Sequence, residues 1–238
     1  MIGQSSRFSS EGGVIVSHAP SRAHLIARMF RAVAIMTPLV LAILLTLAVA
    51  WEMRAVPLTW FDGILSPPGQ PDLFPSKWLT LSHAIVPVVF LLSNLVNRRY
   101  GEHFAMAHVV ASWSCAALIA LAVIFRIDPS LAISGALPSV RVAAAFLGAM
   151  SIGQLAGVFV FDRTRGVEWW RAPLYSALAA SFVAMILFYV AGYGGSDWIW
   201  LNRMAVDAGV KVVMAFALLA PYYLLRPIVR PLGGLGGF

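Results

Sequence analysis

Six apolar runs, each near the length at which a helix can cross a bilayer, constrain the fold of this chain more than any other feature. A helix crosses the bilayer core with about 20 consecutive apolar residues. Stretches such as SPPGQPD, FRIDPS and GYGGSD separate the runs and are typical of helix ends. We therefore predict an all-α polytopic membrane protein with six transmembrane helices. The predicted spans are residues 29–51, 78–96, 105–126, 140–161, 173–194 and 204–225.

The composition agrees with a membrane environment. Hydrophobic residues make up 60% of the 238 residues and charged residues only 11%, whereas a soluble domain has about 25% charged residues. The net charge of +7 comes from basic residues at the ends of apolar runs, so we expect the lipid bilayer, and not nucleic acid, as the partner of this charge. The single cysteine, Cys115, lies inside an apolar run and excludes a disulfide framework.

The distribution of Lys and Arg predicts the orientation of the spans. Eleven basic residues flank one side of the predicted spans and five flank the other. Because cytoplasmic segments are enriched in Lys and Arg, we predict that both termini are cytoplasmic. The predicted organisation is a flexible cytoplasmic tail over residues 1–28, a six-helix domain over 29–226 and a flexible tail over 227–238.

The longest connection, residues 51–78, is then expected to face outward. It carries five prolines and several aromatic residues. Two interpretations stay open: an ordered lid over the protein, or a segment packed on the membrane surface with an aromatic belt. The aromatic residues concerned are Trp51, Trp60, Phe61 and Trp78.

The motifs of several enzyme classes are missing from the sequence. It contains no GxxxxGK[ST] phosphate loop, no HExxH zinc motif and no GxSxG nucleophile elbow. His103 and His108, near the start of the third span, are expected to be an interfacial and a packed residue, not metal ligands. We therefore predict no catalytic residues, no metal site and no cofactor.

Four polar side chains at membrane depth stand out because an amide or a charge there needs a partner or a purpose. They are Asn94, Gln154, Asp207 and Lys211. Asp207 and Lys211 are four residues apart and so lie on one helix face. Two interpretations stay open: a mutually neutralising pair that makes insertion tolerable, or a polar face turned to a cavity with a carboxylate available to a solute.

The fourth span carries small residues along its length. Gly153 and Gly157 form a GxxxG spacing, which lets two helices approach closely. This spacing is compatible with tight packing inside the monomer or between subunits, and a homodimer is one expectation.

Three stretches carry a family resemblance. PVVFLLSNLVNRRYG in the second span is similar to PF-x-FL-x-[TS]-D-L-x-x-R-x-[FY]-G. SVRVAAAFLGAMSIGQLAGVFVFDRTRGVEWWRAP and MAVDAGVKVVMAFALLAPYY follow in the same order and at similar spacing over about residues 80–225. Together they resemble the queuosine-precursor transporter family, also called the vitamin uptake transporter family. The resemblance implies a six-helix bacterial inner-membrane protein that takes up 7-deazaguanine precursors of queuosine, chiefly preQ0 and preQ1.

The resemblance also implies which polar positions matter. The matched positions are Arg141, Gln154, Asp207 and Lys211.

This chain departs from the family pattern at several other positions. Asn94, Gly157 and Ala184 stand where the family commonly has Asp, and Ser181 stands where Asn is frequent. The missing acids disfavour a cationic aminomethyl group, so a related small heterocycle is a second candidate substrate.

The leading hypothesis is a solute transporter with its site between the helices near mid-membrane. Without an ATPase motif, transport would be facilitative, ion-coupled or driven by a separate module. The alternatives are a substrate-capturing subunit of an ATP-driven vitamin uptake system and a membrane scaffold. The predicted roles are the polar edge of the solute for Asn94, Gln154 and Asp207, the ion pair for Lys211, and ring stacking for Trp113 and Tyr189.

Overall fold

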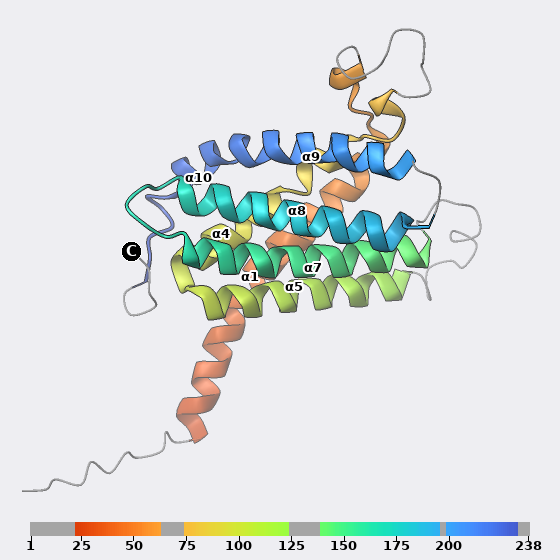
Figure 1. Cartoon of the computed structure of the whole chain (residues 1–238). Helices are drawn as coiled ribbons and strands as arrows, with labels where there is room; N and C mark the ends of the chain where they lie inside the picture. Colours follow the sequence, from red (N-terminus) through yellow and green to blue (C-terminus); the bar gives the residue numbers. More distant parts are fainter. Residues whose placement is uncertain (1–21, 63–73, 124–138, 196–198, 233–238) are drawn as a thin grey trace, which may run out of the picture. The chain divides into compact units, whose positions relative to one another are not determined.

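The computed structural model describes residues 22–62, 74–123, 139–195 and 199–232 (Figure 1). Within these ranges the chain is helical apart from turns and one isolated β-bridge. Six helical stretches are long and apolar enough to cross a membrane. The predicted all-α, six-span architecture is therefore confirmed.

The chain divides into two units, residues up to Ile35 and residues from Met36 onward. Helix α1 (Arg22–Glu52) runs through the boundary and begins seven residues before the predicted first span. In the first unit the large apolar side chains of Met29 and Phe30 are exposed, as expected for a helix that lipid tails surround.

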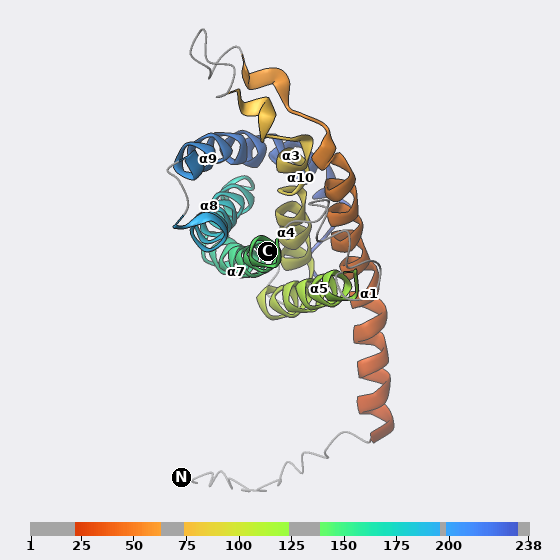
Figure 2. The same ribbon diagram turned by 90° about the vertical axis from the view of Figure 1, so that its right-hand side faces the viewer.

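The second unit contains the other spans. In Figure 1, α5, α7, α8 and α9 lie side by side in that order. Figure 2 views the bundle along its helices and shows these four in an arc, with α3 and α4 on its concave side. Helix α4 contacts α5, α7 and α8. The helices are α3 (Leu81–Ile85), α4 (Val88–Tyr100), α5 (Glu102–Ala122), α7 (Val140–Arg163), α8 (Arg171–Tyr193), α9 (Ile199–Ala217) and α10 (Leu219–Leu225).

The third, fourth and fifth spans lie where the sequence predicts them. Helices α5, α7 and α8 begin within three residues of the predicted starts, and α7 and α8 end within two residues of the predicted ends. The predicted end of the third span, residue 126, lies outside the described residues.

The small face of α7 packs against α8 inside the chain. A Cβ atom at Gly153 would lie 2.6 Å from the Ala180 carbonyl oxygen and from the Ala184 Cβ atom. At Gly157 it would lie 2.8 Å from the Ala180 Cβ atom. Only glycine allows this approach, so the GxxxG spacing serves helix packing within the monomer. The homodimer stays a prediction.

The second and sixth spans are each made of two helices, an interruption that the apolar runs did not predict. The second span breaks at Val86 and Pro87, between α3 and α4. The sixth breaks at Leu218, between α9 and α10, three residues before Pro221. Proline lacks the backbone N–H that the carbonyl four residues earlier needs, and its ring clashes with that carbonyl. Each break thus lies within three residues of a proline inside the apolar run.

The described parts of the long connection between the first and second spans are ordered. The Leu58 N–H donates to the Leu79 carbonyl at 2.9 Å, and the Leu81 N–H donates to the Val56 carbonyl at 2.9 Å. Leu58 and Leu79 are buried with Val210 of α9. Three short 3-10 turns, Met53–Ala55, Thr59–Phe61 and Pro75–Lys77, flank residues 63–73, which lie outside the described part of the chain.

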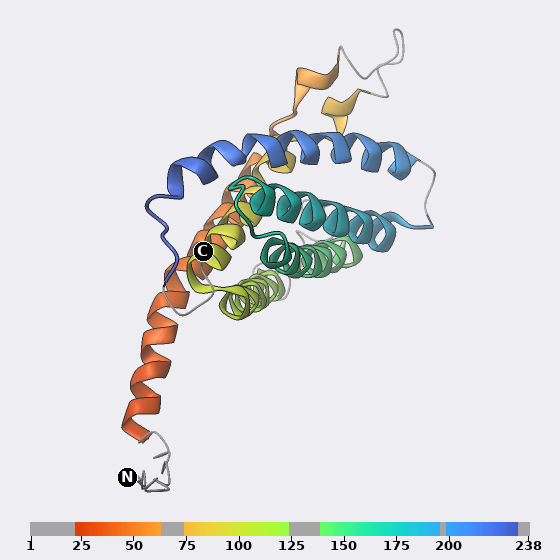
Figure 3. The same ribbon diagram turned by 60° about the vertical axis from the view of Figure 1, so that its left-hand side comes forward.

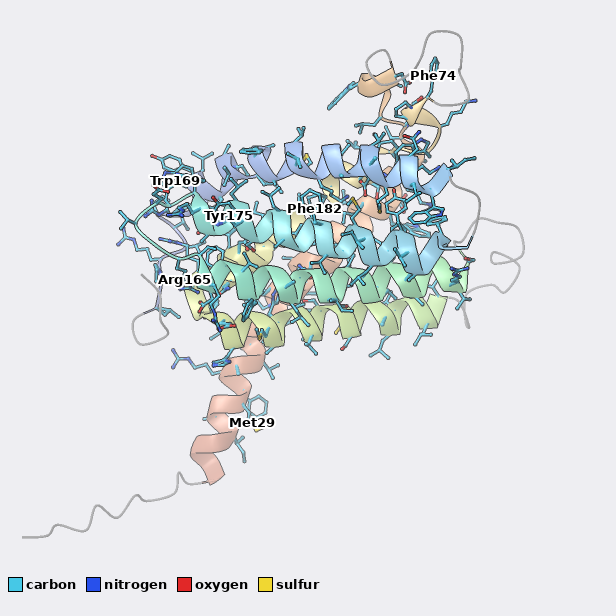
Figure 4. The ribbon with its side chains drawn as sticks, in the orientation of Figure 1. Met29, Phe74, Arg165, Trp169, Tyr175 and Phe182 are labelled. Carbon is cyan, nitrogen blue, oxygen red and sulfur yellow. The ribbon has the colours of Figure 1, made fainter. Side chains whose placement is uncertain are left out.

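Basic residues from three segments meet at one end of the second unit. Arg98 donates to the Val229 carbonyl at 3.2 Å, and Arg165 donates to the Asn97 side-chain oxygen at 2.7 Å. Figure 4 labels Arg165 and Trp169 at this end. The segment after α10 is thus bonded to α4 as far as Leu232, whose N–H donates to the Arg99 carbonyl at 3.1 Å.

Candidate functional site

A cavity of about 110 Å³ lies between α3, α7, α8 and α9. Figure 3 shows the blue α9 running beside the cyan α8, the two helices that supply one wall. Most of the lining is apolar or aromatic with few polar groups, which is typical of sites for small organic molecules. The lining residues are Ser82, His83, Val86, Phe146, Met150, Ala184, Met185, Phe188, Asp207 and Lys211.

Asp207 and Lys211 face this cavity as an ion pair. The Lys211 Nζ atom lies 3.1 Å from Asp207 Oδ1, and the two side chains are only 9% and 6% exposed. The i,i+4 spacing on α9 brings them together, as the sequence predicts. Asp207 and Lys211 therefore combine the two features that the sequence interpretations kept apart: they pair with each other, and they line a cavity.

The Lys211 ammonium has a second acceptor, the backbone carbonyl of His83 at 3.4 Å. In an unbroken helix this carbonyl would accept from the backbone N–H four residues later, but that residue is Pro87. The break in the second span therefore leaves free the carbonyl that the charged residue of the sixth span uses.

His83 is not among the predicted site residues, although its ring borders the cavity. The Thr80 N–H donates to His83 Nδ1 at 3.2 Å, which caps the start of α3. The same ring nitrogen lies 3.3 Å from the Thr80 hydroxyl oxygen, so Thr80 fixes the position of the ring. The edge of the Trp78 ring packs on it at a centroid distance of 6.3 Å. The sequence signal that could have found His83 is its position four residues before Pro87.

Gln154 is almost fully buried and uses its amide inside the protein. Its Nε2 atom donates to the Val89 carbonyl at 2.9 Å and to the Ser93 hydroxyl at 2.7 Å. Its Oε1 atom accepts from the Trp113 indole N–H. Gln154 thus joins α7 to α4 and α5 and does not line the cavity.

Trp113 and Tyr189 lie behind the cavity wall. The Trp113 ring packs edge-on against Phe146 at 6.0 Å, and the Tyr189 ring packs against Phe188 at 5.3 Å. Both phenylalanines line the cavity, whereas Trp113 and Tyr189 do not. The two predicted stacking residues therefore support the aromatic wall from outside.

Asn94 lies in a separate place. Its side-chain oxygen accepts from the Ser176 hydroxyl at 2.6 Å, and its amide donates to the Pro173 carbonyl at 3.2 Å. It borders a second cavity of about 10 Å³, next to the break at Leu218, a space about large enough for one water molecule. Asn94 and Asp207 are thus on different cavities.

Arg141 stands at the start of α7 and is exposed. Its guanidinium donates to the Ala191 carbonyl at 2.8 Å and to the Gly194 carbonyl at 2.7 Å. These groups belong to the C-terminal end of α8, where carbonyls lack intrahelical donors and a cation is favoured. The structure does not bring Arg141 to the cavity.

The family described as "putative vitamin uptake transporter" matches residues 80–225 of the chain. The chain belongs to this family. The match confirms the resemblance seen in the three sequence stretches, and every residue that lines the 110 Å³ cavity falls within it. The vitamin uptake transporter fold of this chain has no match among solved structures.

A relative from Haemophilus influenzae is named "probable queuosine precursor transporter". It is 28% identical to the chain over 173 residues, which cover 67% of this chain and 72% of the relative.

Two of the acids that the vitamin uptake transporter pattern implies are replaced where helices touch. Gly157 lies so close to α8 that even a Cβ atom would clash. Ala184 is 3% exposed, and its Cβ atom would lie 2.6 Å from one placed on Gly153. An aspartate at position 157 cannot fit this packing, which is a physical reason for its absence.

Proposed function

We propose that this chain is an inner-membrane transporter that takes up a 7-deazaguanine precursor of queuosine (preQ0 or preQ1) or a related small heterocycle. The observation that carries the proposal is the buried Asp207–Lys211 pair on the wall of a largely apolar cavity. Membership in the family and the name of the Haemophilus influenzae relative support the substrate class.

The chemistry of the cavity suits such a base. A guanine-like ring presents N–H and NH2 donors on one edge, which a carboxylate such as that of Asp207 accepts. Its flat faces suit aromatic walls, here Phe146 and Phe188. When the solute takes the Asp207 carboxylate, the Lys211 ammonium keeps the His83 carbonyl as an acceptor. Solute and lysine can thus share the site without leaving a buried cation unpaired.

The other predicted site residues act through packing in this proposal. Gln154 accepts from Trp113, whose ring packs against Phe146. The Tyr189 ring packs against Phe188. Asn94 joins α4 to α8 by a hydrogen bond, and Arg141 donates to a carbonyl at the C-terminal end of α8.

Orientation and energy source are also part of the proposal. The excess of basic residues at the end formed by Arg98, Arg165 and the C-terminal segment supports a cytoplasmic location for that end and for both termini. Because the sequence has no phosphate loop, transport is facilitative, ion-coupled or driven by a separate ATPase. An ATPase that copurifies with the chain would favour the substrate-capturing subunit.

The test is the double variant Asp207→Leu/Lys211→Leu. Removing both charges together preserves charge balance and approximate volume, and replacing a buried ion pair in this way is often neutral for stability. We expect uptake of preQ0 into cells to be lost while the purified variant keeps its wild-type melting temperature. In wild type, preQ0 at about 100 times its dissociation constant should add about 2.7 kcal/mol of stability, and the double variant should show no such gain.

Two outcomes separate the alternatives. Normal uptake by the folded double variant would mean that the pair only makes insertion tolerable and that a scaffold or another site is correct. Stabilisation of wild type by another heterocycle, but not by preQ0 or preQ1, would keep the transporter and change its cargo.

A further inference from the structure

The charge balance of the cavity limits what it can hold. Among the described residues that line it, Asp207 is the one acid and Lys211 the one permanently charged base. The carboxylate is already compensated by the ammonium at 3.1 Å. The described part of the wall offers no second carboxylate to serve as the counterion of a bound cation.

Further charge near the cavity is positive. Arg203 lies one helical turn before Asp207 on α9, and its Nε atom is buried without a hydrogen-bond partner among the described residues. His83 also lines the cavity, and its ring carries no negative charge in either protonation state. A cationic solute in the cavity would therefore be repelled by the Lys211 ammonium on its wall and, one helical turn further along α9, by Arg203.

The rest of the described lining gives a cation no counterion. Val86, Met150 and Met185 are apolar, and Ala184 stands at a position where the family resemblance implies an acid. Ser82 adds one hydroxyl. The Ser82 hydroxyl and the phenylalanine rings cannot by themselves replace the hydration shell of an alkylammonium group.

We propose that the cavity selects an uncharged planar heterocycle and excludes cationic ones, so that preQ0, with its neutral nitrile, is the cargo and preQ1, with its aminomethyl cation, is not. The inference rests on the proposed function and deepens it. The donor edge of the ring binds Asp207, the ring faces pack on Phe146 and Phe188, and the substituent at position 7 must be neutral.

The experiment compares three ligands that share one bicyclic ring: preQ0, preQ1 and the 7-hydroxymethyl analogue, which is close in shape to preQ1 but uncharged. Binding to the purified full-length chain is measured by titration calorimetry at pH 7, where the amine of preQ1 is protonated. We expect preQ0 and the hydroxymethyl analogue to bind about 100-fold more tightly than preQ1, since an uncompensated like charge at an interface has an effect of this order.

A charge variant gives the complementary result. In Lys211→Met the Asp207 carboxylate loses its counterion and the wall gains a net negative charge, so the cation of preQ1 is attracted instead of repelled and the preference should invert. If this variant does not fold, Ser82→Asp keeps the ion pair and adds a carboxylate to the wall, and it should raise the affinity for preQ1 without raising that for the hydroxymethyl analogue.

Each outcome has one meaning. Equal binding of all three ligands overturns charge selection and leaves the proposed function intact. Weak binding of both preQ1 and the hydroxymethyl analogue, with tight binding of preQ0, shows selection by size and also overturns the inference. Failure of wild type to bind any of the three overturns the 7-deazaguanine cargo of the proposed function, and with it this inference.

Discussion

Gln154 and Asp207 are both almost fully buried, yet the structure gives them different surroundings. The amide of Gln154 makes its hydrogen bonds to α4 and α5. The carboxylate of Asp207 accepts from Lys211 and borders the cavity. A buried polar group with all its bonds satisfied stabilises the fold, whereas a charged group beside a cavity can bind something else.

Gln154→Leu should therefore lower the stability of the fold and leave the affinity for ligand nearly unchanged. The change leaves the Trp113 indole N–H without an acceptor and removes two bonds to α4. Leaving a buried donor unsatisfied lowers the free energy of unfolding by about 1–3 kcal/mol. Thermal melting of the purified variant measures this loss, and calorimetry on the folded protein should give a nearly unchanged affinity for preQ0.

The matched control is Ser151→Ala. Ser151 lies three residues earlier on α7, and among the described residues its hydroxyl bonds to the Leu147 carbonyl of its own helix, at 2.6 Å. We expect no change in melting temperature. A Gln154→Leu protein that melts normally but no longer binds preQ0 would instead make Gln154 a ligand contact.

At the scale of elements, the two broken spans are the least regular part of the fold. A break in a membrane helix exposes backbone carbonyls that lipid cannot satisfy, so such breaks occur where protein groups or a cavity receive them. The break at Pro87 follows this rule, because the carbonyl it frees, on His83, accepts from Lys211 at 3.4 Å. The break in the second span and the Asp207–Lys211 pair are therefore linked through the His83 carbonyl.

Pro87→Ala should weaken ligand binding without weakening the fold. The new backbone N–H of residue 87 can donate to the His83 carbonyl, which then no longer accepts from Lys211. Lys211 would have the Asp207 carboxylate as its remaining acceptor and would compete with the solute for it. Because a proline inside a helix costs about 3 kcal/mol, the melting temperature should stay the same or rise. The affinity for preQ0 should fall about tenfold, in line with the loss of one hydrogen bond to a charged group.

Pro38→Ala is the comparison for this effect. Pro38 also lies inside a helix, α1, but does not line the cavity. Its replacement should leave the affinity for preQ0 unchanged. If both variants bind preQ0 as wild type does, the freed carbonyl of His83 has no role in binding.

At the scale of the whole molecule, basic side chains mark one end of the second unit. Arg98 and Arg165 tie the ends of α4 and α7 to neighbouring segments, and the chain after α10 returns to the same place. Cytoplasmic ends of membrane proteins are rich in such residues.

Cysteine labelling tests which side this end faces. On a Cys115→Ala background, Lys77→Cys places a thiol in the connection between the first and second spans, and Val167→Cys places one in the exposed turn between α7 and α8. A maleimide that cannot cross membranes should label Lys77→Cys in intact cells and Val167→Cys only after permeabilisation. The reverse pattern would place both termini outside, against the distribution of Lys and Arg.

Local properties of this protein followed from the sequence alone. The six spans depend on the length and polarity of each run, and the Asp207–Lys211 pair depends on a spacing of four residues within one helix. Both the spans and the ion pair can be predicted without knowing which helices pack against each other.

The partners of the other polar groups were decided by the tertiary structure. Gln154 bonds to a carbonyl 65 residues away, and Lys211 bonds to one 128 residues away. Arg141 closes the end of α8, a contact across 50 residues. Such contacts depend on how closely and in what register the helices pack, which here depends on glycines on α7 and on a proline in the second span. The apolar pattern of each run sets neither property, because one set of lipid-compatible helices can pack in many ways until backbone contacts and buried hydrogen bonds select one.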